Sequence, residues 1–160
     1  MWKEIVGRKQ VAEKKHHPDD WMALEEMARA QLTSEDPGFP LENALSLNPE
    51  HNEKGWQAGE RGPQTITLSF AKPVRIRRIF LQFSEHEDER TQEFWLRYMT
   101  QTGIQQEIVR QQWNFSPKGS TQEIEDYTVD LEGVTRLELR IDPDLGREQV
   151  RASLHTWRVA

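Results

Sequence analysis

The stretch QTITLSFAKPVRIRRIFLQF, residues 64–83, decides the fold class, because apolar and polar residues alternate along it. At its start, Ile66, Leu68 and Phe70 are separated by single Thr or Ser residues. An apolar residue at every second position is the pattern of a β-strand with one buried and one solvated face. Residues 64–70 are therefore predicted to form a half-buried strand.

The second half of this stretch keeps the alternation but changes its parity. After an expected turn at residues 71–73, apolar residues occupy even positions up to Ile76 and odd positions from Ile79 onward. One additional residue near Arg77-Arg78 would return all of them to a single buried face. We therefore predict a β-bulge there.

Further segments with the same period follow towards the C-terminus, and turn signals such as Thr102-Gly103 and Glu132-Gly133 separate them. We predict strands at residues 94–99, 104–113, 127–131, 137–141 and 152–160. Six or more short strands joined by turns are typical of an antiparallel β-sandwich or jelly roll. The predicted fold is therefore mainly β.

The N-terminal part of the chain has a different pattern. Pro18 suits a first helical position, and Trp21, Leu24, Ala28 and Leu32 recur at helical spacing, so a helix is predicted over residues 18–32. A short strand is expected before it. Residues 37–63 contain four prolines and four glycines and are predicted to be a long ordered loop.

Length, charge and cysteine content exclude several classes of protein. A chain of 160 residues is expected to form one domain, here an N-terminal strand and helix in 1–36 and a sandwich in 37–160. The absence of cysteine excludes disulfides, thiolate catalysis and cysteine-ligated metals. A net charge of −6 argues against nucleic acid as the partner.

Targeting segments are also missing from the sequence. No apolar run approaches the length of about 18 residues that suggests a transmembrane helix. The first residues, MWKEIVGRKQ, carry charge where a signal peptide has its apolar region. We therefore expect a cytoplasmic protein that has no membrane partner.

The order of several short motifs is similar to that of a known family. Asn43-Ala44-Leu45 and Gly55-Trp56-Gln57-Ala58 precede Gln64–Phe70, the stretch Lys72–Ile79 follows, and Ala152–Trp157 closes the chain. This order resembles the framework of discoidin-like domains, the coagulation-factor C-type domains. Those domains have a galactose-binding-like jelly-roll fold.

The resemblance covers about residues 40–160. It implies a sandwich of eight antiparallel strands whose loops at one end bind ligands, often sugars and sometimes lipids or proteins. Many relatives hold a structural calcium ion with an acidic residue of the last strand. Where the family has Leu-Arg-x-Glu, this sequence has Leu154-His155-Thr156-Trp157, which lacks that carboxylate. No metal or other cofactor is therefore expected.

The segment RQQWNFSPKGS, residues 110–120, is the first candidate for a ligand site. The ring of Trp113 would stack on the apolar face of a sugar, and nearby amide and guanidinium groups would bind its hydroxyls. Those groups belong to Arg110, Gln111 and Asn114. The alternative is that Trp113 fills the core and the polar groups stabilise the loop.

Two further arginines complete the candidate ligand-binding set. Arg61 is expected at the same end of the sandwich, and Arg90 offers a planar donor group for hydroxyls or carboxylates. Arg90 adjoins an acidic segment, residues 84–94. Clustered carboxylates can bind a hard cation, but their spacing fits no known ligand pattern, and a solvated turn is the alternative.

Catalytic motifs do not stand out. The histidines lack helical ligand spacing, and no Gly-x-Ser-x-Gly nucleophile turn occurs. We therefore expect a non-catalytic module that binds carbohydrate or another small polyhydroxy ligand. The alternative is an intracellular domain for protein–protein interaction or scaffolding, for which the helix at 18–32 would supply an apolar patch.

Overall fold

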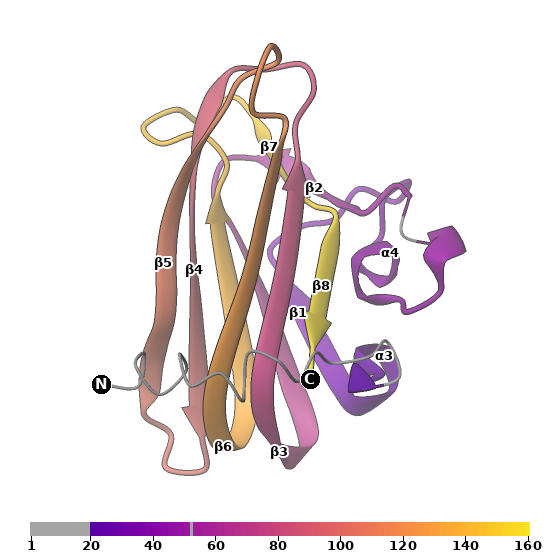
Figure 1. The fold of residues 1–160 in the computed structure, drawn as a ribbon, viewed down its shortest axis with the longest axis vertical. Helices are drawn as coiled ribbons and strands as arrows, with labels where there is room; N and C mark the ends of the chain where they lie inside the picture. Colours follow the sequence, from indigo (N-terminus) through magenta and orange to yellow (C-terminus); the bar gives the residue numbers. More distant parts are fainter. Residues whose placement is uncertain (1–19, 52) are drawn as a thin grey trace.

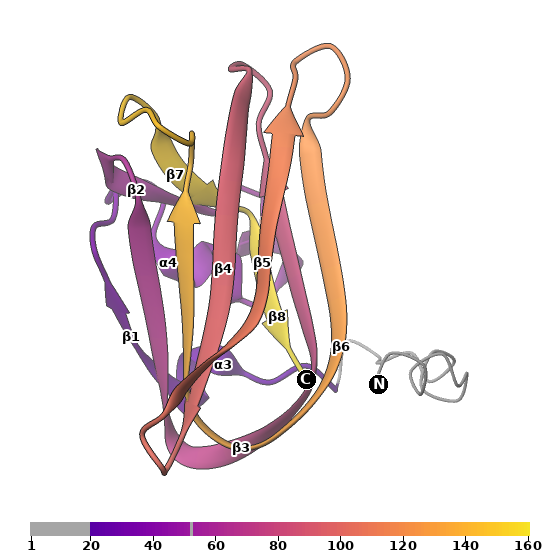
Figure 2. The ribbon, with the colours of Figure 1, turned by 90° about the vertical axis from the view of Figure 1, so that its left-hand side faces the viewer.

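Two long strands organise the structure. The computed structural model describes residues 20–51 and 53–160. Strands β3 (Gln64–Ser84) and β6 (Gln122–Asp142) are each 21 residues long and pair antiparallel along their lengths, from Gln64 opposite Ile141 to Ser84 opposite Gln122. Both strands bend sharply at one end of the molecule, so each contributes to two layers (Figures 1 and 2).

The first layer contains five strands in the order β1, β3, β6, β4 and β5. It combines β1 (Ala28–Leu32), β4 (Arg90–Thr100) and β5 (Gln105–Phe115) with the first half of β3 and the second half of β6. In the second layer, the second half of β3 pairs with the first half of β6 along one edge and with β8 (Thr156–Val159) along the other. The predicted antiparallel sandwich is confirmed.

The predicted bulge is also confirmed. The backbone N–H groups of Arg77 and Arg78 both donate to the carbonyl oxygen of Ala160, at 2.7 and 2.9 Å. Two consecutive donors on one acceptor mark the extra residue of a β-bulge. It moves the buried face from Ile76 to Ile79, and both side chains are fully buried.

The turns predicted at 71–73 and at Glu132-Gly133 are bends within continuous strands. Pairing of β3 with β6 is interrupted between Ser69 and Val74 and then resumes. Gly133 adopts a φ of 66° next to Val134, the residue of β6 that pairs with Val74 where pairing resumes. The two strands bend together because each keeps the other as its hydrogen-bonding partner across the change of layer.

The helix predicted over residues 18–32 is much shorter than expected. Within the described part of this range, the α-helix is limited to α3 (Leu24–Met27), and the following residues form β1, which pairs with β3 from Ala28 opposite Phe70 to Leu32 opposite Ile66. The edge of β3 offers unpaired backbone groups to this segment, whereas an isolated helix of this length is marginal. The strand predicted before the helix lies outside the described residues.

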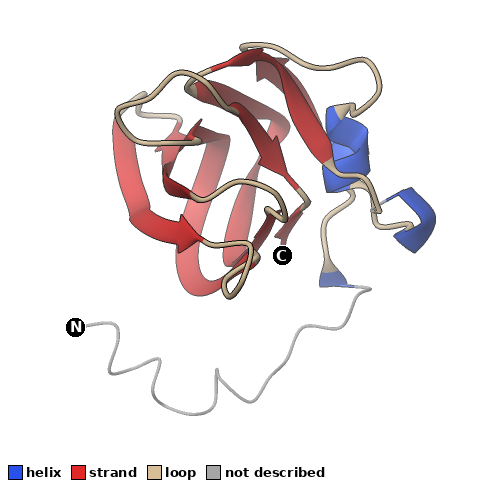
Figure 3. Ribbon diagram, turned by 90° about the horizontal axis from the view of Figure 1, so that it is seen from above, coloured by secondary structure: helices blue, strands red, loops and turns tan. Residues whose placement is uncertain are grey.

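The segment predicted as a long loop contains regular elements. These are α4 (Leu41–Leu45), the 3-10 turn η2 (Pro49–His51) and β2 (Trp56–Arg61). Strand β2 pairs with β7 (Arg151–Leu154) in a separate two-stranded sheet. The helices lie together on one side of the strands (Figure 3).

The core lies between the two layers. Phe83 of β3 and Phe94 of β4 bring their ring centroids to 5.2 Å across it. Trp56 and Trp157 are also fully buried, so the aromatic residues supply much of the buried area. Within the described part of the chain, no helix is long and apolar enough to cross a membrane.

Candidate functional site

Three loops meet at the end of the sandwich opposite the bends of β3 and β6. Residues 85–89 join β3 to β4, residues 116–121 join β5 to β6, and residues 143–150 join β6 to β7 (Figure 1). Loops held by a rigid sheet are where binding groups commonly lie. We call this region the loop end.

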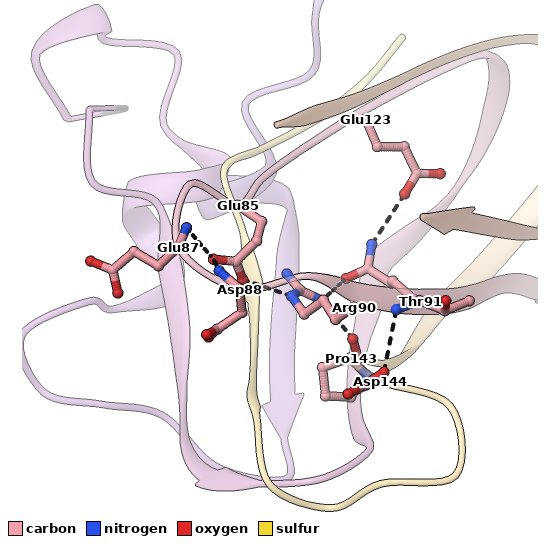
Figure 4. Close-up of polar contacts among 9 residues, drawn as sticks. Glu85, Glu87, Asp88, Arg90, Thr91, Glu123, Pro143 and Asp144 are labelled. Carbon is pink, nitrogen blue, oxygen red and sulfur yellow. Dashed lines mark hydrogen bonds and ion pairs between the residues drawn. The ribbon is translucent and has the colours of Figure 1, made fainter. Parts of the chain in front are cut away.

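Arg90, the first residue of β4, connects these loops. Its Nε donates to Oε1 of Glu85 at 2.7 Å, and its Nη1 donates to the carbonyl oxygen of Pro143 at 2.6 Å and to Oε1 of Gln92 at 3.1 Å (Figure 4). The guanidinium carbon lies 4.6 Å from the ring centroid of Phe115. Because the side chain is only 1% exposed, Arg90 positions the loops instead of facing a ligand.

Glu85 shapes the loop that precedes Arg90. Its Oε2 accepts hydrogen bonds from the backbone N–H groups of Glu87 and Asp88, both at 3.0 Å (Figure 4). Burial opposes ionisation of Glu85, but the hydrogen bonds from Arg90 and from these two N–H groups outweigh it and lower the pKa of the carboxyl. Glu85 is therefore a carboxylate at neutral pH.

A second acid lies behind Arg90. Glu123 of β6 is fully buried, and its Oε1 accepts a hydrogen bond from Nε2 of Gln92 at 3.2 Å. Its Oε2 is buried without a hydrogen-bond partner. Burial is the main reason that the pKa of Glu123 is raised to about 9, and the neighbouring carboxyl group of Glu125 raises it further. Glu123 is therefore a neutral carboxylic acid at pH 7.

Two clefts open on either side of the 85–90 segment. The first, which we call the Phe39 cleft, encloses about 610 Å³. Its lining includes Phe39, Gln57, Arg61, Glu87, Asp88 and His155. The second, the Asn114 cleft, encloses about 640 Å³. Its lining includes Arg90, Thr91, Asn114, Ser116, Asp144 and Arg147.

Phe39 reaches its cleft from a tight turn. Oδ1 of Asp36 accepts the N–H of Gly38 at 2.8 Å, and the Asp36 carbonyl accepts the N–H of Phe39 at 2.8 Å. The carbonyl of Phe39 then accepts the N–H of Gln57 at 3.1 Å, which fixes the turn against β2. The ring is half-buried, so part of its face remains available.

His155 contributes an uncharged polar group to the same cleft. It lies between β7 and β8, and its backbone N–H donates to the carbonyl of Gln82 at 2.9 Å. Burial, together with the positive charge of Arg158, lowers the pKa of the imidazole. The ring is therefore neutral at neutral pH. Its Nδ1 already shares a hydrogen bond with the Thr156 hydroxyl at 2.8 Å, which leaves Nε2 for the cleft.

Among its described lining residues, the Asn114 cleft has no accessible ring. Phe115 is 1% exposed beneath Arg90. Oδ1 of Asn114 accepts a hydrogen bond from the Thr91 hydroxyl at 2.8 Å, and Oδ1 of Asp144 accepts the Thr91 N–H at 3.3 Å. Several polar groups of this cleft are thus bonded to one another.

The structure separates the candidate residues of β5. Successive residues of a strand project to opposite faces. Trp113 and Gln111 are half-buried on the inner side, and Trp113 packs against the core. Arg110 lies on the outer face, where it binds Glu93 and Glu107 at 3.1 and 2.9 Å. The Trp113 ring therefore does not form one site with Arg110 and Asn114.

The remaining candidates divide between the two clefts. Arg61 is exposed on the Phe39 cleft, whereas Asn114 lines the other cleft and Arg90 is buried at its base. Sequence reasoning missed Phe39, although the neighbouring Pro37-Gly38 and Pro40 mark a turn that would expose it. In residues 20–51 and 53–160, no three acidic or histidine side chains converge as a metal-binding group.

Comparisons with known proteins identify the fold. No family model and no curated protein matches the sequence significantly. Among solved structures, a family 32 carbohydrate-binding module of Clostridium perfringens NanJ in complex with galactose has a TM-score of 0.58 and 17% identity, covering 87% of this chain and 96% of its own.

Two further solved structures agree. CBM32-3 from a family 31 glycoside hydrolase of Clostridium perfringens has a TM-score of 0.61 and 12% identity, covering 91% of this chain and 97% of its own. Chitosan-binding module 1 of a chitosanase/glucanase from Paenibacillus sp. IK-5 has a TM-score of 0.58 and 16% identity, covering 91% of this chain and 99% of its own. The chain therefore has the galactose-binding-like jelly-roll fold of family 32 carbohydrate-binding modules.

Proposed function

We propose that this protein is a non-catalytic carbohydrate-binding module whose ligand occupies the Phe39 cleft. The observation that carries the proposal is a partly exposed aromatic ring within a cleft that also contains amide, guanidinium, imidazole and carboxylate groups. The fold supports it, since two solved structures with this fold are described as a galactose complex and a chitosan-binding module.

The chemistry of the Phe39 cleft suits a sugar. The ring of Phe39 offers an apolar face to the C–H groups of a pyranose. Gln57, Arg61 and the neutral His155 offer donors to its hydroxyls, and the carboxylates of Glu87 and Asp88 accept from them. A ring with a few convergent polar groups is the usual composition of a small-molecule site.

The Asn114 cleft is the less favourable position. Among the described residues that line it, the one aromatic ring is that of Phe115, which Arg90 covers, and Asn114 and Asp144 already bind Thr91. A sugar bound there would have no aromatic face to stack on. We therefore assign the ligand to the Phe39 cleft.

Titration calorimetry with galactose and with a chitosan oligosaccharide tests this proposal. We expect one of these probes to bind, and Phe39→Ala and Arg61→Ala each to weaken its binding at least tenfold. Ile104→Ala is the control, because Ile104 is 63% exposed in the turn between β4 and β5, away from the loop end. If neither probe binds at millimolar concentration, the proposal is contradicted.

A protein-interaction role has less support from the surface. Large exposed apolar residues within the described ranges are Leu47, Ile104 and Ile124. They lie after α4, in the β4–β5 turn and on β6, so they do not form one patch on neighbouring residues. Isolated apolar residues of this kind are normal on a protein surface.

A further inference from the structure

We propose that Glu123 is a positioning residue for the loop end: the proton on its buried carboxyl keeps Arg90 paired with Glu85 and so holds the 85–89 loop in place. This proposal rests on the proposed function only for the effect on the ligand. The effect on the loop follows from the contacts of the described residues alone.

A continuous set of hydrogen bonds connects Glu123 to the loop. Gln92 donates through Nε2 to Glu123 and accepts through Oε1 from Arg90, which in turn donates to Glu85. A guanidinium group only donates hydrogen bonds, so the amide oxygen of Gln92 must face Arg90 and its NH2 group must face Glu123. Gln92 therefore couples the two residues in a fixed orientation.

The buried charges around this network do not balance unless Glu123 is protonated. Arg90 carries one positive charge, which its ion pair with Glu85, at 2.7 Å, neutralises. The groups that face Glu123 are Phe83 from β3, Gln92 and Arg90 from β4, and Glu125 along β6. Tyr127 lies further along β6, and the charge of an ionised Glu123 would raise the pKa of its hydroxyl. Because Arg90 is the one cation among them, an ionised Glu123 would be a second buried carboxylate without its own partner.

Ionisation of Glu123 therefore has a defined consequence. Two carboxylates would compete for the guanidinium of Arg90, and the hydrogen bond from Arg90 to Glu85 would weaken. Glu85 also holds the N–H groups of Glu87 and Asp88, which line the Phe39 cleft. Loss of the proton at Glu123 is thus transmitted to one wall of the cleft.

Carboxyl ¹³C NMR of glutamate-labelled protein tests the coupling directly. Between pH 5 and 11, the Glu123 signal is expected to titrate with an alkaline midpoint, near pH 9. The Glu85 signal should show a second change at the same midpoint. In Glu123→Gln, which stays neutral, that second change should disappear, whereas a residue that only fills space would leave the Glu85 profile unaltered.

Glu138→Gln is the matched control. Glu138 also accepts a hydrogen bond from a glutamine amide, Nε2 of Gln105 at 2.9 Å, but it lies away from the loop end. Its replacement should leave both titrations unchanged. The proposal is overturned if Glu123 titrates at its ordinary acidic pH, or if the Glu85 signal ignores the Glu123 midpoint in the wild-type protein.

Ligand binding is measured as a separate arm. The affinity for galactose, a neutral probe, should fall at least threefold across the Glu123 midpoint in the wild-type protein and stay constant in Glu123→Gln. A coupled NMR titration without any galactose or chitosan binding would contradict the proposed function and support the loop coupling. Equal pH dependence of affinity in both proteins would contradict the link from Glu123 to the cleft.

Discussion

The guanidinium of Arg90 and the carboxylate of Glu85 form an ion pair at 2.7 Å in which the Arg90 side chain is 1% exposed and that of Glu85 is 15% exposed. The sequence predicts Arg90 as a ligand-binding donor, because it adjoins an acidic loop. In the structure its guanidinium is buried and donates to Glu85, Gln92 and the carbonyl of Pro143, so Arg90 holds the loops in position.

Replacement of Arg90 tests this role. Arg90→Ala leaves Glu85 and the Pro143 carbonyl without their donor, and breaking a buried ion pair in this way typically costs about 3–5 kcal/mol. We expect a decrease of that size in the free energy of unfolding, measured by urea denaturation. Arg110→Ala is the control: its ion pairs are exposed, so its loss should be much smaller than that of Arg90→Ala.

Gly55 is expected to tolerate no side chain. Its φ is 65°, and an added Cβ would lie 2.7 Å from the carbonyl oxygen of Leu154 and 2.8 Å from Cα of His155. Gly55→Ala should therefore combine backbone strain with a steric clash against β7, and lower the free energy of unfolding by more than about 2 kcal/mol. Differential scanning calorimetry would show this as a reduced Tm.

Gly103 separates the two contributions. It has a similar φ of 81°, but an added Cβ would have no atom within 4 Å. Gly103→Ala should therefore cost only the backbone strain, about 1–2 kcal/mol. Equal losses at Gly55 and Gly103 would show that the close approach to Leu154 has no energetic effect.

Much of the fold could be predicted from local patterns. The alternation in residues 64–70 and the parity change at Arg77-Arg78 both depend on which residues are buried. The positions of apolar residues in the sequence indicate burial directly. The bends within β3 and β6 could not be predicted this way. Turn residues such as Lys72-Pro73 look alike whether the chain reverses or remains paired with a distant strand.

The helix and the candidate site show the same limit. Whether Ala28–Leu32 is helical depends on a free edge of β3, which is a tertiary property. The division of β5 between two faces, by contrast, follows from strand alternation, which places Trp113 on the face opposite to that of Arg110 and Asn114. The Phe39 cleft joins segments more than a hundred residues apart in sequence, Phe39 and His155 among them, so no local motif indicates it.

Stability is expected to depend on pH through Glu123. Its folded pKa of about 9 lies above its ordinary value of 4.5, so the stabilisation from the neutral acid is complete below pH 4.5 and is lost progressively up to pH 9. The loss is at most about 1.4 kcal/mol per pH unit. Glu85, with a lowered pKa, has the opposite effect: its stabilisation is present at neutral pH and is lost as the solution is acidified.

Glu123→Gln isolates the first of these effects. The free energy of unfolding of the wild-type protein relative to Glu123→Gln should decrease from pH 5 to pH 8, as measured by urea denaturation at each pH. The difference between the two proteins should be constant below pH 4.5. A difference that does not change between pH 5 and pH 8 would show that Glu123 is ionised in the folded protein.

Trp113 and Phe39 should respond in opposite ways to truncation. Trp113 packs against the core from the inner side of β5, so Trp113→Ala should lower the free energy of unfolding by about 3 kcal/mol, at the lower end of the range for large aromatic residues. Because its ring does not line the Phe39 cleft, sugar affinity should be unchanged. Phe39→Ala should weaken sugar binding at least tenfold and cost less stability than Trp113→Ala, since the Phe39 ring is half-buried in a surface turn. One thermal melt and one titration for each variant distinguish the two residues, and loss of binding in a folded Trp113→Ala protein would return the ligand site to β5.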